Sequence, residues 1–172
     1  SPNRGCTDVR AEASAALLEK AYASPARSGA RCVLDTNIVL DLVVFRDPGV
    51  ELIAMAIRSG VAVPVTSHAC LEELRRVLAY PQLNLDESGR LAAFEHFRAL
   101  AKLVDVPSAR SAPLPLCTDA DDQKLLELAW HAHARCLITK DKALLRLARA
   151  VAKLGRFAVL KPEKFGRYVQ AT

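Results

Sequence analysis

The sequence predicts an α/β domain whose parallel sheet is covered by helices on both faces. Short, uniformly apolar segments alternate with longer segments of helical pattern along the chain. Strands buried on both faces form continuous apolar runs, whereas half-exposed strands alternate in polarity. The chain has 172 residues, 51% of them hydrophobic and 25% charged. This length and composition suit one domain with its own core.

The first part of the chain differs from the rest. Residues 8–23 are Ala-rich and predict a helix, and the segment 24–29 (SPARSG) ends it. We therefore expect an N-terminal helical extension and linker over residues 1–30, followed by the domain itself over residues 31–172.

Two strands and three helices are predicted in the first half of the domain. The strands are expected at 32–34 and 61–66, and the helices at 48–59, 67–79 and 86–103. Ser67 has the position of a helix N-cap, and Tyr80-Pro81 ends the helix that it begins.

The second half begins with a Pro- and Ser-rich loop at 107–118. Strands are then expected at 136–139 and 157–160, and helices at 121–134, from Asp141 to Leu154, and after Pro162. No internal repeat is present.

Charge is unevenly distributed, although the formal net charge is only +5. From Lys140 to the end there are nine Lys and Arg residues, opposed only by Asp141 and Glu163. This basic third suits a polyanion such as a nucleic acid, but a merely solvated surface would have the same composition.

Other classes of protein find little support. No apolar run approaches the roughly 20 residues of a membrane span, and charged residues near the start argue against a signal peptide. We therefore expect a cytoplasmic protein. The five cysteines are scattered without a C-x-x-C pair, which argues against a zinc site or a disulfide framework.

Two predicted strands end in an acidic residue. Val33-Leu34 leads into Asp35, and the strand at 136–139 is followed by Asp141. Ligands of open α/β sheets bind beyond the carboxyl ends of the strands, so both carboxylates lie where a site would form. Taken singly, Asp35 could be a turn residue and Asp141 a helix N-cap.

Helical phase selects a third acid. On the helix 67–79, Glu73 lies at the border of the apolar stripe, and Glu72 lies nearly opposite it. Glu73 can therefore face inward at a rim. The alternative is a flanking charge paired with Arg75 or Arg76.

The helix 121–134 begins with a cluster of acids. Asp122 projects onto the core-facing stripe, Asp121 lies at its edge, and Gln123 points away. A carboxylate on such a stripe is costly unless it is paired or bound to a cation. Alternatively, Asp119, Asp121 and Asp122 only cap the helix.

Four carboxylates converging in one notch (Asp35, Glu73, Asp122 and Asp141) would repel one another strongly. Hard divalent cations would relieve that repulsion, and all-oxygen ligation suits Mg²⁺ or Mn²⁺, as one or two ions, better than zinc. Such ions support the in-line hydrolysis of a phosphodiester.

At these residues the sequence resembles the PIN domain family. The matching pieces, in the family's order and spacing, are RCVLDTNIVL (31–40), LEELRRVL (71–78), TDADDQKLLELA (118–129) and CLITKDKALL (136–145). A lone D-T-N is a weak signal, but four pieces in order are specific. The resemblance covers about residues 31–168.

The resemblance implies a three-layer α/β/α sandwich with a central parallel sheet, and Mg²⁺- or Mn²⁺-dependent cleavage of single-stranded RNA by activated water. Carried over, the catalytic and metal-binding acids are Asp35, Glu73, Asp122 and Asp141. Supporting positions are Thr36, Asn37, Asp119, Asp121 and Thr139. Some PIN subgroups have the third acid at the position of Gln123, so here Asp122 must take that role.

The tail VLKPEKF (159–165) resembles the end of a bacterial PIN subgroup described as toxin components. This resemblance implies that the chain is the toxin of a toxin–antitoxin pair. Its partners would then be an antitoxin protein and a second copy of the chain, as a homodimer. RNA would contact the basic residues Lys140, Lys142 and Arg146.

Four alternatives compete with a nuclease. A non-catalytic PIN-like module that binds RNA or protein would be expected to lose the acids. A receiver domain would require an adjacent acid pair after the first strand, and a dehalogenase-like phosphatase would require an acid where Asn37 stands. A Ser or Cys hydrolase is disfavoured because His68, His96, His131 and His133 have no nucleophile elbow near them.

Overall fold

The structure, a computed structural model, describes residues 29–108 and 112–170. The predicted helix at 8–23 lies outside the described residues. Five strands form one sheet in the order β3-β2-β1-β4-β5, and every pair is parallel. The strands are β1 (Ala30–Leu34), β2 (Ala62–Thr66), β3 (Lys102–Leu103), β4 (Cys136–Ile138) and β5 (Ala158–Leu160).

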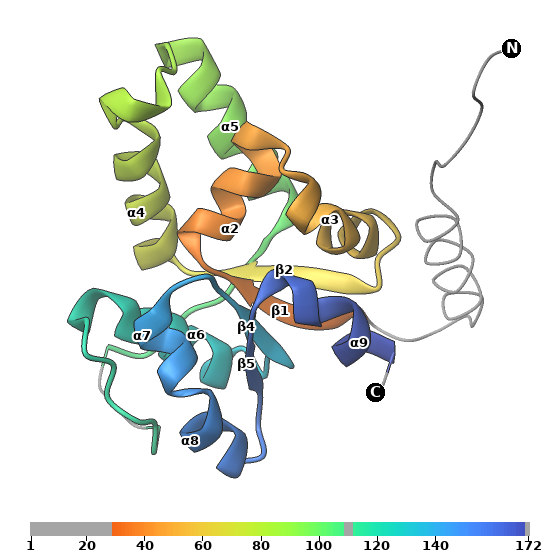
Figure 1. Cartoon of the computed structure of the whole chain (residues 1–172). Helices are drawn as coiled ribbons and strands as arrows, with labels where there is room; N and C mark the ends of the chain where they lie inside the picture. Colours follow the sequence, from red (N-terminus) through yellow and green to blue (C-terminus); the bar gives the residue numbers. More distant parts are fainter. Residues whose placement is uncertain (1–28, 109–111, 171–172) are drawn as a thin grey trace, which may run out of the picture.

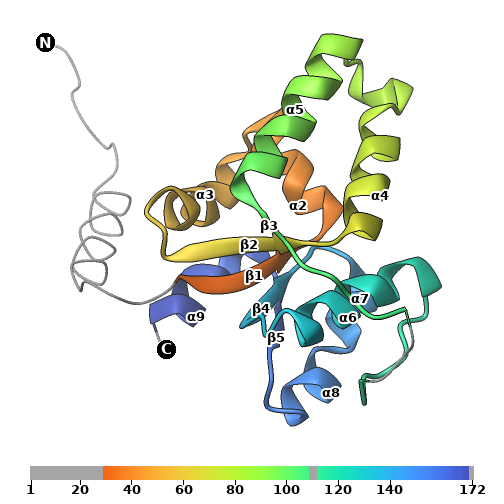
Figure 2. The same ribbon diagram turned by 180° about the vertical axis from the view of Figure 1, so that it is seen from behind.

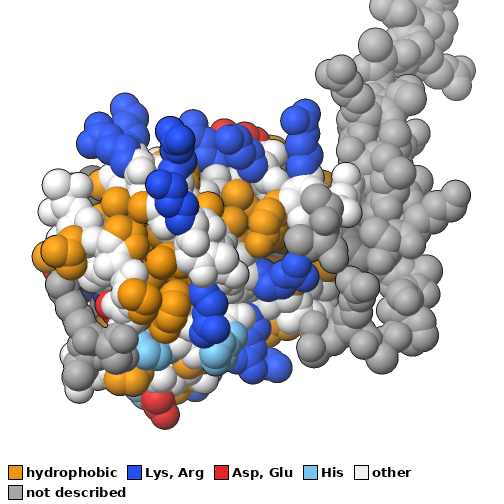
Figure 3. Space-filling view, turned by 90° about the horizontal axis from the view of Figure 1, so that it is seen from below, with side chains coloured by type: hydrophobic (Ala, Val, Ile, Leu, Met, Phe, Trp, Pro, Cys, Tyr) orange, Lys and Arg blue, Asp and Glu red, His pale blue; other side chains and the backbone are white. Residues whose placement is uncertain are grey.

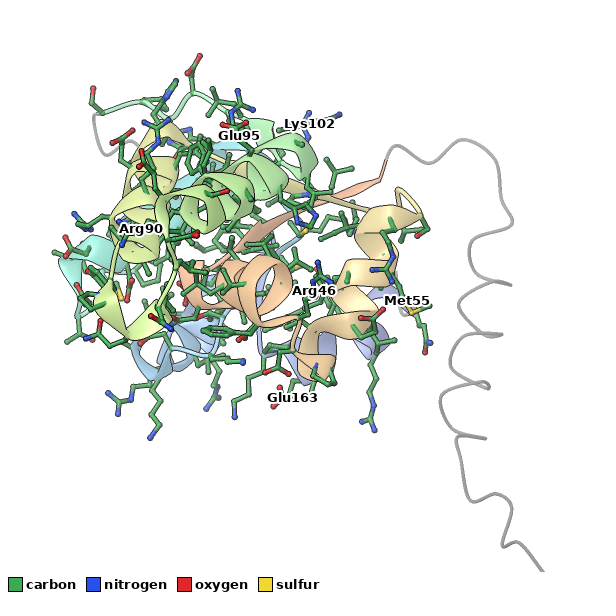
Figure 4. The ribbon with its side chains drawn as sticks, turned by 90° about the horizontal axis from the view of Figure 1, so that it is seen from above. Arg46, Met55, Arg90, Glu95, Lys102 and Glu163 are labelled. Carbon is green, nitrogen blue, oxygen red and sulfur yellow. The ribbon has the colours of Figure 1, made fainter. Side chains whose placement is uncertain are left out.

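Helices cover both faces of this sheet, which confirms the predicted three-layer α/β/α sandwich (Figure 1; Figure 2). One layer contains α2 (Thr36–Leu40), α3 (Glu51–Arg58), α4 (His68–Leu78), α5 (Glu87–Leu100) and α9 (Phe165–Gln170). Figure 4 looks onto this layer from above and labels Arg90 and Glu95 on α5 and Met55 on α3. The other layer contains α6 (Gln123–His131), α7 (Lys142–Arg146) and α8 (Ala148–Lys153).

Each central strand contributes to two hydrophobic cores. On β1, Cys32 and Leu34 face the core under α2 to α5, and Val33 faces the core over α6 to α8. On β4, Ile138 and Leu137 divide in the same way. Side chains alternate between the faces of a strand, so a strand buried on both sides must be apolar throughout.

The order of the strands creates a switch point at the centre of the sheet. From β1 the chain adds β2 and then β3 on one side, whereas β4 and β5 lie on the other. Leu34 of β1 is in register with Ile138 of β4, so these two strands end side by side. A crevice forms beyond the carboxyl ends of strands at such a point, and ligands bind there.

Most predicted elements are present, with small shifts at their ends. The predicted helix at 121–134 is a 3₁₀ turn (Ala120–Asp122) followed by α6, and His133 beyond it has a φ of +50°. The helix predicted between Asp141 and Leu154 is divided at Leu147 into α7 and α8.

Two segments differ from the prediction. Lys102-Leu103 was expected to end a helix, but it forms the edge strand β3 and pairs with Val65 and Thr66. The segment after Asp35, for which no element was predicted, continues as α2 and then as a π-helical turn (Asp41–Phe45). Its apolar run has no clear helical period, so its helical state depends on packing against the core.

The described cysteines are free thiols. Cys32 and Cys136 are neighbours in register on β1 and β4, and both are buried. Burial raises the pKa of Cys32 well above its usual value and that of Cys136 to about 12, so both thiols stay protonated and pack as small apolar side chains.

Within residues 29–108 and 112–170, none of the helices combines the length and the apolar character that a membrane span requires.

Candidate active site

Asp35 and Thr139 meet where β1 and β4 end. The backbone N–H of Asp35 donates to the carbonyl of Ile138 at 3.0 Å, which joins the two strand ends. The Thr139 hydroxyl donates to Oδ2 of Asp35 at 2.6 Å. Both side chains are buried, with 6% of Asp35 and none of Thr139 exposed. The carboxylate therefore has one defined orientation at the switch point.

The same hydroxyl also fixes Asp141. Thr139 Oγ1 accepts a hydrogen bond from the backbone N–H of Asp141 at 2.9 Å. The carboxylate of Asp141 accepts from the backbone N–H of Leu144 at 3.0 Å and so caps α7. The predicted capping role is thus present, and Asp141 also lines the pocket described below.

Burial raises the pKa of Asp35, and the nearby charges of Glu73 and Asp141 raise it further. Hydrogen bonds from Thr139 and from the backbone of Thr36 act in the opposite direction. The carboxyl therefore lies in a site that disfavours its charge while holding its oxygens in place.

Glu73 faces inward from α4, as its helical phase predicted. Its side chain is 21% exposed, whereas that of Glu72 is 73% exposed and lies 3.6 Å from Arg75. The partner of Glu73 is neither of the expected arginines. It is Lys124 of α6, whose ammonium lies 2.5 Å from Oε2 of Glu73.

The acids before α6 have different environments. Asp119 accepts from the backbone N–H of Asp121 at 2.9 Å and caps the 3₁₀ turn, and Asp121 is exposed. Asp122 is partly buried, and its pKa is raised to about 6, first by burial and then by the charges of Asp35, Asp119, Asp141 and Glu73. Among the acids at 119–122, Asp122 is the one that lines the pocket with Asp35.

Gln123 corrects one detail of the prediction. Its side chain was expected to point away from the interior, but it is 5% exposed. Its Oε1 accepts from the backbone N–H of Cys117 at 2.7 Å, and its Nε2 donates to the carbonyl of Pro115 at 3.3 Å. The loop before α6 covers this helix face, and the amide anchors that loop beside Asp122.

One pocket of about 350 Å³ brings the four predicted acids together. Asp35, Glu73, Asp122 and Asp141 line it, with Thr36 and Asn37 beside them. Leu40, Val77 and Leu83 add apolar surface to the lining. Four carboxylates from four separate segments therefore share one small space at the carboxyl edge of the sheet.

The donor types in this pocket fit a hard divalent cation. Carboxylate oxygen is the ligand that Mg²⁺ and Mn²⁺ prefer. In the described part of the chain, no three His, Cys, Asp or Glu side chains are close enough to hold an ion as they stand. Glu73 is held by Lys124, which supplies positive charge to the acidic pocket. The pair uses Oε2 of Glu73, and the second carboxylate oxygen of Glu73 is the one that would bind an ion while the pair is kept.

The three predicted RNA contacts have different surroundings. Lys140 is ion-paired with the carboxylate of Asp41 on the π-helical turn, and this hydrogen bond raises the pKa of Lys140. Lys142 and Arg146 are exposed on α7. From below, Lys and Arg side chains stand along one edge of the face made by the α6 to α8 layer (Figure 3).

Sequence reasoning missed Lys124 and Asp41. Lys124 lies two residues after Asp122, the last acid of the cluster, and Asp41 lies within the apolar segment that follows Asp35. Each makes its ion pair with a residue distant in sequence, at Glu73 and Lys140. For Asp41, the one acid in an otherwise apolar segment was a signal that it has a partner. For Lys124, the signal was a lysine just after a cluster of acids.

Comparison with known proteins agrees with this geometry. The family model described as PIN domain matches residues 31–143, about two thirds of the chain. The chain belongs to the PIN domain family. This confirms the family resemblance drawn from the four sequence pieces.

The fold of this PIN domain is similar to that of a solved chain from VapBC2 of Rickettsia felis, which was crystallised bound to a DNA fragment from their promoter. The TM-score is 0.52 at 11% identity, and the match covers 76% of this chain and 98% of the other. At this identity the likeness concerns the fold alone. No curated protein matches the sequence.

Proposed function

We propose that this PIN domain is a metal-dependent endoribonuclease that hydrolyses phosphodiester bonds of single-stranded RNA with activated water. The observation that carries the proposal is the shared pocket of Asp35, Glu73, Asp122 and Asp141 at the switch point of the sheet. Membership of a family whose members are in general nucleases supports it.

Asp35, Glu73, Asp122 and Asp141 would hold Mg²⁺ or Mn²⁺, with Asp119 and Asp121 as supporting acids. When bound, the ion supplies Lewis-acid chemistry, which activates water and offsets charge that develops on the phosphate. Thr139 orients Asp35 through its 2.6 Å hydrogen bond. Thr36 and Asn37 line the same pocket and can donate or accept hydrogen bonds there.

Asp122 is suited to exchange a proton near neutral pH. Its pKa is raised to about 6 by burial and by the neighbouring carboxylates. A carboxyl poised in this range can take up or release a proton without a large penalty. A bound cation would favour the deprotonated carboxylate, so Asp122 would release this proton when the ion binds.

The basic C-terminal third would bind the RNA backbone outside the pocket. Lys142 and Arg146 are exposed on α7, directly after Asp141. Lys140 would contribute less, because its ammonium is already paired with Asp41. Contacts of this kind add affinity without sequence preference.

We also propose an antitoxin protein and a second copy of the chain as partners. The fold is similar to a chain solved in a VapBC2 assembly bound to promoter DNA, and the C-terminal sequence resembles PIN toxin components. Size-exclusion chromatography with light scattering would test the dimer.

The test of activity is incubation of the purified chain with labelled single-stranded RNA, with and without Mn²⁺ or Mg²⁺, beside Asp35→Asn. Cleavage that requires the ion and is absent from the variant is the expected result. Equal cleavage by the variant would refute the assignment of the site. Absence of both cleavage and ion binding would favour a non-catalytic RNA- or protein-binding module.

A further inference from the structure

A second cavity, of about 510 Å³, lies beside the carboxylate pocket. Three segments line it: the start of α4 (Ser67, His68, Ala69), the chain after β3 (104–108), and the first turns of α6. The first two segments directly follow β2 and β3, so the cavity lies at the same edge of the sheet as Asp35 and Asp141. It occupies the β2–β3 half of that edge.

Lys124 connects the two spaces. Its side chain lines the second cavity, and its ammonium lies 2.5 Å from Glu73, which lines the carboxylate pocket. Both side chains are mostly buried, at 24% and 21% exposure. A chain passing from one space to the other would therefore meet a positive charge at the boundary.

The lining of the second cavity suits a neutral, hydrogen-bonding ligand with an apolar face. Val104, Val106 and Ala69 supply apolar surface, and His68 supplies an imidazole. Asp105 is exposed and brings carboxylate acceptors, whereas Glu127 lies 3.7 Å from His131. Lys124 is the one Lys or Arg among the described lining residues.

This distribution of charge distinguishes between the parts of a nucleotide. The acids would repel a phosphate within the cavity, but they can accept hydrogen bonds from ribose hydroxyls and base amino groups. The ammonium of Lys124 fits a phosphate at the boundary. The volume lies within the roughly 300–1,000 Å³ of small-molecule sites.

We propose that this cavity is the subsite for the nucleoside next to the scissile phosphate, and that Lys124 binds the phosphate that links this nucleoside to the carboxylate pocket. The inference rests on the proposed ribonuclease function. It specifies the path of the RNA strand from the carboxylate pocket into the second cavity. An ammonium has three N–H donors, so Lys124 can keep its ion pair with Glu73 while it donates to the phosphate.

The direct test is a titration of the ¹⁵N-labelled full chain with AMP or UMP, followed by amide chemical shifts. We expect shifts at Ala69, Val106 and Lys124. Ala69→Phe should abolish them by placing a ring in the part of the cavity that the base would occupy, and Ala92→Phe, at an exposed position on α5, should leave them unchanged. Shifts confined to other surfaces, or shifts that survive Ala69→Phe, would overturn the proposal.

Inorganic phosphate separates the two parts of the ligand. Phosphate alone is expected to shift Lys124 but not Ala69 or Val106. If phosphate alone reproduced the full pattern, the cavity would be an anion site and the nucleoside assignment would be wrong.

Kinetics give a second test on short RNA substrates. Ala69→Phe should raise KM about tenfold or more, as expected when one base is no longer bound, with kcat little changed. Lys124→Met should raise KM, and Lys124→Arg should restore much of the affinity. An unchanged KM in both Ala69→Phe and Lys124→Met would refute the subsite.

The two proposals fail in different ways. Metal-dependent cleavage with no nucleotide shifts at the cavity would overturn the subsite and leave the nuclease standing. Nucleotide shifts at the cavity without any cleavage would overturn the nuclease function and support a nucleotide-binding site.

Discussion

The hydroxyl of Thr139 lies between two carboxylates and binds both segments that hold them. It donates to Oδ2 of Asp35 at 2.6 Å and accepts from the backbone N–H of Asp141 at 2.9 Å. Because Thr139 is completely buried, water cannot replace either bond. One side chain therefore sets the spacing of two of the four proposed metal ligands.

Replacing Thr139 with Val keeps its shape and removes both hydrogen bonds. We expect a loss of about 1–3 kcal/mol in the free energy of unfolding, because buried polar groups lose their partners. Activity should fall about 10- to 100-fold, as for other residues that orient a metal ligand. Urea denaturation and single-turnover cleavage would measure the two effects.

Thr66 provides the matched control for that variant. It ends β2, is 1% exposed, and its hydroxyl has no hydrogen-bond partner among the described residues. Thr66→Val should leave both stability and activity unchanged or slightly improve stability. Equal damage from Thr66→Val and Thr139→Val would mean that the Thr139 hydroxyl has no special role.

Glu73→Gln should reduce cleavage about 100-fold or more, in the range of groups that act directly in catalysis. The amide removes a carboxylate from the pocket and also breaks the ion pair with Lys124. Glu72→Gln, one residue away and largely exposed, should be nearly silent. Comparable losses of kcat/KM in both variants would show that the pocket is not the reaction centre.

The stability of the ion-free protein should fall as pH rises from about 4 to about 6. The pKa of Asp122 is raised to about 6, so in this range the folded state binds more protons at this group than the unfolded state does. Asp35, whose pKa is raised too, acts in the same direction. The stabilisation by these protonated carboxyls is complete below their pKa in the unfolded chain. It is lost as the pH rises through their pKa in the folded protein.

Asp122→Asn should flatten that dependence, as followed by urea denaturation with EDTA present. Added Mn²⁺ should reverse the slope, because binding requires the deprotonated carboxylates. A stability profile in which Asp122→Asn and the wild type coincide from pH 4 to pH 7 would contradict the electrostatic coupling of the pocket.

Neutralising Lys142 or Arg146 should lower the salt dependence of RNA binding. The slope of log K against log salt should become shallower by about 0.7 for each phosphate that the variant no longer binds. Lys140→Ala should have a smaller effect, because Asp41 already holds that ammonium. Fluorescence anisotropy with a labelled oligonucleotide would measure the slopes. Unchanged slopes in all three variants would place the RNA on another face.

Much of the fold was predictable because it depends on local pattern. Continuous apolar runs located β1, β2, β4 and β5, and Ser67 caps α4 by accepting from the backbone N–H of Cys70 at 3.3 Å. Helical phase distinguished Glu73 from Glu72 for the same reason. The apolar stripe of α4 is buried, and this determines which of the two side chains faces the interior.

What could not be predicted depends on long-range contacts. Lys102-Leu103 becomes a strand only because the exposed edge of β2 is available for pairing. Glu73 finds Lys124 rather than its neighbours Arg75 and Arg76, because α6 packs beside α4 across the carboxyl edge of the sheet. Gln123 is buried by a loop whose path no local signal determines.

The central claim is metal-dependent hydrolysis of RNA by water at Asp35 and its neighbouring acids. Cleavage in H₂¹⁸O followed by mass spectrometry of the products tests it most directly. We predict one ¹⁸O in the single phosphate that each cleavage leaves and none in the hydroxyl at the other new end. This labelling should occur only when Mg²⁺ or Mn²⁺ is present, and not with Asp35→Asn. Products that carry a 2′,3′-cyclic phosphate, or labelling that persists in EDTA, would contradict the account.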